Sequence, residues 1–111
     1  MTICTSPSLF FERMVPEALR RGRVSLDDYG LLDFRLLGQE PGEWTVDLSR
    51  RRCRRGGISR PDFYLEMSSA DFRALLAERL VLETAVRQGR VRFIGEPSFL
   101  AVFGRLLHSV A

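Results

Sequence analysis

The sequence predicts one α/β domain of the α+β type over residues 1–111, with a roughly five-stranded, mostly antiparallel sheet and helices covering one face. A chain of 111 residues has the size of a single domain. Several short segments alternate apolar and polar side chains, which is typical of strands with one buried face. Other segments carry apolar residues at helical spacing, so helices can cover that face and complete a two-layer fold.

The N-terminal segment predicts two short helices. Ser6 precedes Pro7, as in a helix N-cap followed by proline at the first helical position, where its missing N–H costs nothing. Pro16 is expected to divide this helix from a second one over residues 17–21, which Gly22 ends. The residues expected on a shared apolar face of the first helix are Phe10, Phe11 and Met14.

Alternation predicts four strands in the middle of the chain. The first covers residues 32–36, and a turn at residues 38–42, rich in glycine, follows it. The second covers 43–48, a weaker third covers 51–55, and the fourth covers 63–67. Because each strand has one apolar face, helices need to cover one side of the sheet only. The residues expected on that side are Leu32, Phe34, Leu36, Trp44, Val46, Leu48, Phe63, Leu65 and Met67.

The second half of the chain begins with a capped helix. Ser68 is the expected N-cap, and Asp71 stands three residues on, in the position of a capping box. A shorter helix over 82–88 should end at Gly89, which releases the chain into a strand over 90–94. The apolar stripe of the capped helix is Phe72, Leu75 and Leu76.

The last segment, residues 97–111, predicts a strongly amphipathic helix. Its apolar residues other than Phe99 span an arc of about 160° on a helical wheel, and His108 lies opposite the centre of that arc, facing solvent. Two interpretations stay open: these side chains form ordinary core, or they share a packing role with contact to a ligand. The apolar residues are Phe99, Leu100, Val102, Phe103, Leu106, Leu107 and Val110.

The chemistry-bearing residues argue against an enzyme. His108 is the only histidine, and no cysteine pair or carboxylate–histidine spacing resembles a metal site. We expect no catalytic residue, no metal and no cofactor. Asp47 and Glu66 fall on polar strand faces and are expected to be solvated. Cys4 and Cys53 are interpreted as free thiols of a cytoplasmic protein, because the N-terminus lacks a secretory signal and no apolar run could span a membrane.

The arginine run at residues 50–55 is the one concentrated charge, although the net charge is only +3. Three interpretations stay open: a solvated hairpin, a surface for an anionic membrane or acidic partner, and, least favoured, a nucleic-acid contact. The residues assigned to the membrane or partner surface are Arg51, Arg52, Arg54 and Arg55.

Three segments in order carry a family resemblance: "EPGEWTVDL" at 40–48, "RPDFYLEMSSADFRALL" at 60–76 and "QGRVRFIGEPSFLAVFGRLL" at 88–107. Their order and spacing resemble the sterol carrier protein 2 family of lipid-binding domains over about residues 10–108, nearly the whole chain. The family enters its second strand through a glycine-rich turn before tryptophan, and its capped helix through a Pro-Asp strand. A glycine-flanked strand then leads to a terminal amphipathic helix.

The resemblance implies a function. The sheet and helices of the family enclose an apolar tunnel for sterols, fatty acyl chains or similar lipids, and the terminal helix closes it. We therefore expect non-enzymatic binding, transfer or presentation of an apolar ligand. The alternative is an accessory subunit of a biosynthetic complex for an apolar product such as a quinone. The side chains expected to contact ligand are Phe34, Trp44, Phe72, Leu75, Leu76, Leu82, Val86, Phe93, Phe99, Phe103, Leu106 and Leu107.

Overall fold

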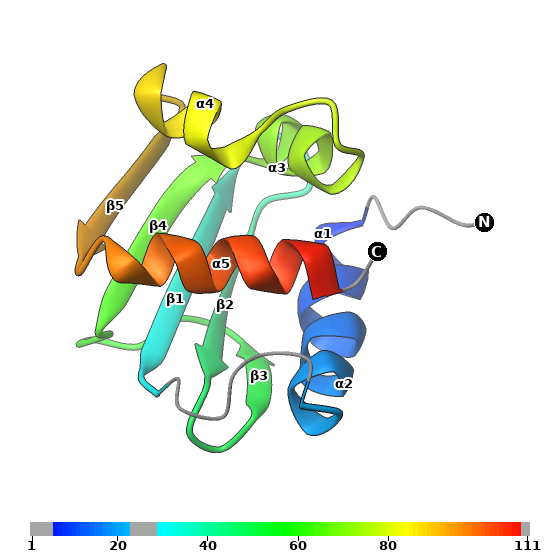
Figure 1. Cartoon of the computed structure of the whole chain (residues 1–111), viewed down its shortest axis with the longest axis vertical. Coiled ribbons are helices and arrows are strands. Elements are labelled where there is room, and N and C mark those ends of the chain that lie inside the picture. The colour runs from blue at the N-terminus through cyan, green and yellow to red at the C-terminus, as the bar shows by residue number, and fades with distance from the viewer. Residues whose placement is uncertain (1–5, 23–28, 110–111) are drawn as a thin grey trace.

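The computed structural model describes residues 6–22 and 29–109, and its centre is a five-stranded sheet in the order β3-β2-β1-β4-β5 (Figure 1). Neighbouring strands are antiparallel except β1 and β4, which are parallel. The predicted mostly antiparallel sheet is therefore confirmed, with one parallel pair at its centre. The strands are β1 (Leu31–Leu37), β2 (Gly42–Asp47), β3 (Arg52–Arg55), β4 (Phe63–Ser68) and β5 (Val91–Gly95).

The parallel pair results from the connection between β3 and β4, residues 56–62. After two hairpins, β3 ends at the end of the sheet where β1 also ends. β4 begins at the opposite end, beside the start of β1, so the connection has to run back along the polar face. Gly56 N–H donates to the Glu43 carbonyl at one end of this connection, over 2.7 Å. Asp62 N–H donates to the Leu31 carbonyl at the other end, over 2.9 Å. Sequence alternation alone did not predict this crossing.

One face of the sheet is apolar, as the alternation predicts. The expected inward residues of β1, β2 and β4 are all buried, together with Leu48 just beyond β2. Figure 1 shows α5 crossing this face, with the N-terminal helices beside β3 and with α3 and α4 at one end of the sheet. The helices of the second half are α3 (Ser69–Leu76), α4 (Leu82–Arg87) and α5 (Ser98–Ser109).

The N-terminal helices are continuous, which corrects the predicted break at Pro16. α1 (Pro7–Leu9), a π-helix η1 (Phe10–Met14) and α2 (Val15–Arg20) follow one another without a gap. Val15 N–H donates to the Phe10 carbonyl five residues back. In an α-helix, the ring of a proline clashes with the carbonyl four residues before it. The wider π-helical turn lies at that point in the chain, directly before Pro16. Helical structure continues to Arg20, and Gly22 has φ +68°.

The predicted helix boundaries are confirmed elsewhere. The Ser6 hydroxyl accepts a hydrogen bond from Leu9 N–H over 3.3 Å, and the Ser68 hydroxyl accepts one from Asp71 N–H over 3.0 Å. Gly89, with φ +73°, follows α4 and leads into β5. These caps satisfy N–H groups that the first turn of a helix leaves without intrahelical partners.

Gly95 is the last residue of β5, shortly before α5, and lies very close to the backbone at the start of β4. It has φ +126°, and a Cβ there would lie 2.6 Å from the Asp62 carbonyl oxygen. Gly89 also has positive φ but no atom within 4 Å of its Cβ position. We expect Gly89→Ala to lower the free energy of unfolding by about 1–2 kcal/mol. Gly95→Ala should cost about 1–3 kcal/mol more, because backbone must move. Urea unfolding of both variants measures the difference; equal losses would contradict the close approach.

Candidate functional site

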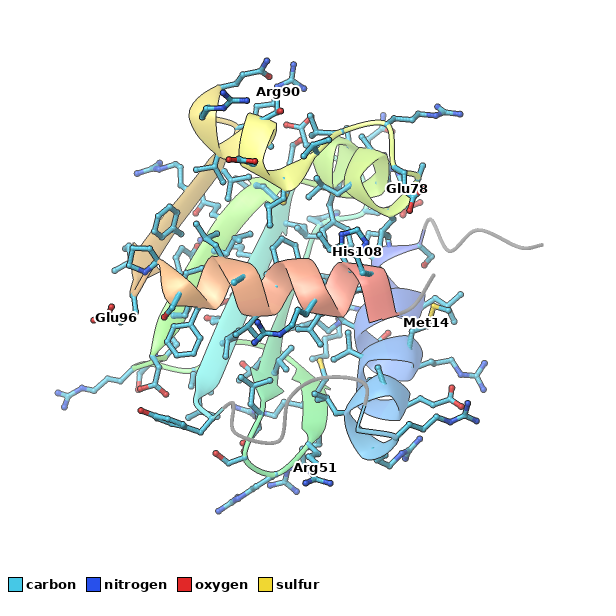
Figure 2. The ribbon with its side chains drawn as sticks, in the orientation of Figure 1. Met14, Arg51, Glu78, Arg90, Glu96 and His108 are labelled. Carbon is cyan, nitrogen blue, oxygen red and sulfur yellow. The ribbon has the colours of Figure 1, made fainter. Side chains whose placement is uncertain are left out.

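The apolar side of α5 faces the sheet. Phe103 and Leu106 are fully buried and Val102 nearly so. Phe99, Leu100 and Leu107 are half-buried and pack against the same core. His108 is exposed as predicted, and Figure 2 shows it on the part of α5 near its C-terminal end. The predicted apolar residue Val110 lies outside the described residues.

Six aromatic side chains form the middle of the apolar layer, and we call them the aromatic centre. Phe11 is its hub: its ring stacks on Trp44 at a centroid distance of 4.8 Å and on Phe72 at 5.3 Å. Phe103 of α5 lies 5.1 Å from Phe34 and 6.2 Å from Phe72. Rings in such contact fill the space between helices and sheet. The members are Phe10, Phe11, Phe34, Trp44, Phe72 and Phe103, all 0–1% exposed.

The surroundings of Trp44 explain two other residues. A Cβ at Gly42 would overlap the indole ring, so glycine at this position lets the ring lie flat against the start of β2. The guanidinium of Arg55 lies 5.1 Å from the centre of the same ring. The indole Nε1 is buried without a hydrogen-bond partner among the described residues.

A second group of apolar side chains packs against the buried core and keeps partial exposure; we call it the apolar seam. It connects α3, α4, β5 and α5. Leu82 lies over Gly104, where a Cβ would be 4.0 Å from Leu82 Cδ2. Most members are aliphatic side chains that can change rotamer, unlike the interlocked rings beside them. The members are Leu76, Leu80, Leu82, Val86, Phe93, Phe99, Leu100 and Leu107.

The twelve side chains predicted to contact ligand all belong to one continuous apolar cluster. Their contact with a ligand stays a prediction. Phe10, Phe11, Leu80 and Leu100 belong to the same cluster but were not assigned to the site from sequence. The sequence did indicate that Phe10 and Phe11 belong to the core, because two adjacent large rings directly after a capped helix start both need burial. Six of the twelve are buried, Phe34, Trp44, Phe72, Leu75, Phe103 and Leu106, and six lie in the seam, Leu76, Leu82, Val86, Phe93, Phe99 and Leu107.

The four arginines predicted to share a surface are all exposed, and the alternation of β3 divides those within the strand between its two faces; their role as a docking surface stays a prediction. Strand alternation places Arg52 and Arg54 opposite Asp47 and Thr45 on the polar face of the sheet. Arg55 pairs with Trp44 on the apolar side, and its Nη1 lies 3.7 Å from Glu12 Oε1. Arg55 therefore lies on the side of the sheet that faces the N-terminal helix, since residues of β3 alternate between its two faces.

The polar face contains a buried carboxylate that the sequence did not single out. Asp33 is 2% exposed because the connection 56–62 crosses over it. Thr45 beneath the same connection donates its hydroxyl to the Gly56 carbonyl over 2.8 Å. A Cβ at Gly57 would overlap the Glu43 carboxylate and lie 3.1 Å from Asp33 Oδ2, so glycine lets the chain pass directly over both acids. Asp33 Oδ1 has no partner among the described residues.

The carboxyl groups of Asp33 and Glu43 interact directly, through a hydrogen bond. The pKa of Asp33 rises from 3.8 to about 7, chiefly because the carboxyl is buried and secondly because of its hydrogen bond to Glu43 and the repulsion by the Glu43 charge. The Ile58 N–H and the Arg35 guanidinium oppose that rise. Asp33 therefore keeps its proton toward neutral pH, hydrogen-bonded to Glu43.

Other reactive groups are few in the described part of the chain. Burial, and secondly Glu12, raises the pKa of the Cys53 thiol to about 12, which leaves it protonated and a poor nucleophile. Cys4 lies outside the described residues. Asp47 and Glu66 are half-buried; Glu66 accepts a hydrogen bond from the Tyr64 hydroxyl over 2.7 Å. Within residues 6–22 and 29–109, no three His, Cys, Asp or Glu side chains gather to hold a metal, and no helix could cross a membrane.

Known proteins resemble this chain in sequence and in structure. The model of the SCP-2 sterol transfer family matches residues 29–108. No curated protein matches the sequence significantly. The sterol carrier protein 2 of Aedes aegypti, in complex with the C16 fatty acid palmitate, superimposes with a TM-score of 0.75 at 16% identity and 100% coverage of both chains.

Two further solved structures share the fold. Palmitated SCP2L2 from Aedes aegypti has a TM-score of 0.72 at 20% identity, covering 93% of this chain and 95% of that one. The sec-alkyl sulfatase PisA1, as a double mutant, has a TM-score of 0.68 at 18% identity, covering 94% of this chain but only 16% of the sulfatase. The fold therefore occurs both alone and as a small part of a longer chain.

The proton of Asp33 predicts a pH-dependent stability. The pKa of Asp33 is higher in the folded chain than its ordinary value of 3.8, so its contribution is largest below that pH and is lost as pH rises toward about 7. Asp33→Asn keeps the size of the side chain and removes the titration. We expect this variant to be up to about 4 kcal/mol more stable than the wild type near pH 8.

Urea unfolding of wild type and variant across the acid-to-neutral range measures the effect. Glu43→Gln is the matched control, and it should reduce the pH slope without abolishing it, because Asp33 stays buried. The same slope in the wild type and in Asp33→Asn would show that Asp33 is not the titrating group.

Proposed function

The chain belongs to the SCP-2 sterol transfer family, and from that premise we propose that it binds an apolar ligand, a fatty acyl chain or a sterol, in its apolar layer. It carries or presents this ligand without a catalytic step. The apolar seam is the observation that supports the proposal most. Its half-buried side chains come from α3, α4, β5, α5 and the loop after α3, and they pack against the buried core.

The packing of the layer favours entry at the seam over entry through the centre. The rings of Phe11, Phe34 and Phe103 contact one another or their neighbours, so a ligand in the centre would have to separate stacked rings. An acyl chain in the seam displaces aliphatic side chains that already reach solvent. Leu82 and Leu107 can turn outward at the cost of a rotamer change rather than of a stacked pair.

The energetics of an acyl chain are compatible with binding. Burying roughly sixteen methylene groups at about 0.8 kcal/mol each contributes about 13 kcal/mol gross. Association and ordering cost about 4–15 kcal/mol. An empty cavity of ~300 Å³ would cost about 7 kcal/mol at ~24 cal/mol per Å³. That cost is comparable with the total stability of a small domain, ~5–15 kcal/mol. The layer therefore favours a state in which side chains or ligand fill it.

Palmitate should stabilise the folded chain. At a free concentration about a hundredfold above Kd, preferential binding to the folded state adds about 2.7 kcal/mol. For a domain of this size that raises Tm by roughly ten degrees. Differential scanning fluorimetry with palmitate measures the shift. Acetate, which has the same carboxylate and almost no chain, should leave Tm unchanged. A panel of acyl chains, sterols and quinones that all leave Tm unmoved would remove the main support for a carrier.

Gly104 tests whether the seam is the binding site. Its Cβ position has only Leu82 in ordinary contact, so Gly104→Ala fits and should raise the free energy of unfolding by about 1 kcal/mol through helix propensity. Gly104→Leu places a branched side chain between α5 and α4. We expect Gly104→Ala to keep the palmitate-induced rise in Tm and Gly104→Leu to lose most of it. An unchanged rise in Gly104→Leu would place the ligand elsewhere.

A second function is favoured by the sulfatase comparison. There this fold is a small part of a longer enzyme chain, which fits an accessory subunit of a complex that makes an apolar product such as a quinone, without transfer activity of its own. Native mass spectrometry of the protein purified from its own cells separates the two functions. Co-purified lipid supports a carrier, and a stoichiometric protein partner supports an accessory unit.

A further inference from the structure

Three arginines at one end of the sheet carry charge that the described part of the chain does not neutralise. In the β2–β3 hairpin, Arg50 Nε lies 4.0 Å from Asp47 Oδ2, and Arg55 is paired with Glu12. The remaining arginines of the hairpin, Arg51, Arg52 and Arg54, take part in none of the ion pairs between described residues, and all three are exposed. Figure 2 shows the first of them at the turn, at the end of the molecule.

An exposed aromatic side chain lies at the same end. Tyr29 is 74% exposed, and the carbonyl of the next residue, Gly30, accepts a hydrogen bond from Leu48 N–H over 3.0 Å. Since Leu48 leads directly into the β2–β3 turn, Tyr29 and the turn share one end of the sheet. We call Tyr29, Arg51, Arg52 and Arg54 the hairpin surface. α2 contacts β3 and lies beside it in Figure 1.

The part of this surface nearest to the apolar seam is Tyr29, since Arg52 and Arg54 lie on the polar face of the sheet. The ring of Phe99, the first seam residue of α5, has atoms 3.2 and 3.3 Å from the position that a Cβ would take on Gly30. A body that contacts Tyr29 therefore lies close to Phe99. A lipid that leaves or enters the seam at Phe99 would do so near the hairpin surface.

We propose that the hairpin surface docks the chain on a membrane with anionic phospholipid headgroups, a step that rests on the proposed carrier function. Guanidinium groups bind phosphate through paired N–H donors, and arginines near an anionic leaflet are attracted to it. Tyrosine is enriched where headgroups meet the acyl region, because one end of its ring is apolar and the other polar. Arginine beside an exposed tyrosine at the end of the seam fits a lipid surface better than it fits an acidic protein or a nucleic acid.

The test compares two triple variants that remove the same charge. Arg51, Arg52 and Arg54 are replaced by Gln in one; the exposed arginines Arg79, Arg87 and Arg92, which lie in the second half of the chain, are replaced in the other. Binding is measured by co-sedimentation with phosphatidylcholine vesicles, with and without phosphatidylserine. We expect the hairpin variant to lose roughly a hundredfold in partitioning onto phosphatidylserine vesicles and the control variant to lose at most a few-fold. Tyr29→Ser should lose several-fold on both kinds of vesicle.

Equal losses in the two triple variants would overturn the hairpin surface, since net charge alone would then explain binding. No preference of the wild type for phosphatidylserine would overturn it as well. So would tighter binding of the wild type to poly-glutamate or to an oligonucleotide than to the vesicles. The palmitate-induced rise in Tm, measured on the same variants, separates this proposal from the carrier function. If the wild type shows the palmitate-induced rise in Tm but does not bind phosphatidylserine vesicles, the docking surface is overturned and the carrier function is not.

Discussion

The stack of Phe11 between Trp44 and Phe72 is the contact on which the rest of the structure depends. It joins the N-terminal helix to β2 on one side and to α3 on the other, with interplanar angles of 13° and 18°. Phe72 in turn stacks on Phe103, which brings in α5. Three helical segments are therefore held on one face of the sheet through rings that contact each other. Closely packed rings have little room to change rotamer, so this contact makes the middle of the apolar layer its most rigid part.

The rigid centre determines where adaptation is possible. Around it lie aliphatic side chains that are only half-buried, and Gly104 leaves room beside Leu82 between α5 and α4. An apolar layer with a rigid centre and an adjustable rim can accept a chain-like ligand without losing its fold. The proposed ligand site lies in the rim, where side chains are half-buried, and not among the interlocked rings of the centre.

The opposite face of the sheet has a separate role. It carries the charged side chains and the crossing segment 56–62, which covers Asp33 and Thr45. Because this crossing makes β1 and β4 parallel, the central pair of the sheet depends on a polar cover as well as on the apolar layer. The proton that Asp33 keeps beside Glu43 links that cover to pH, and the β2–β3 hairpin at the edge of the same face presents unpaired arginines.

Sequence by itself determined the elements of this fold and most of its apolar cluster. Alternation located the strands, Ser6 and Ser68 located two helix starts, and helical spacing identified the buried side of α5, because these signals are local and depend only on the period of the backbone. Tertiary structure alone decided the rest. The crossing over Asp33, the separation of Arg55 from the other arginines, and the division between centre and seam all depend on residues far apart in the chain. Local periodicity says which side of an element is apolar, but only packing against other elements decides which of those side chains interlock and which stay free to move.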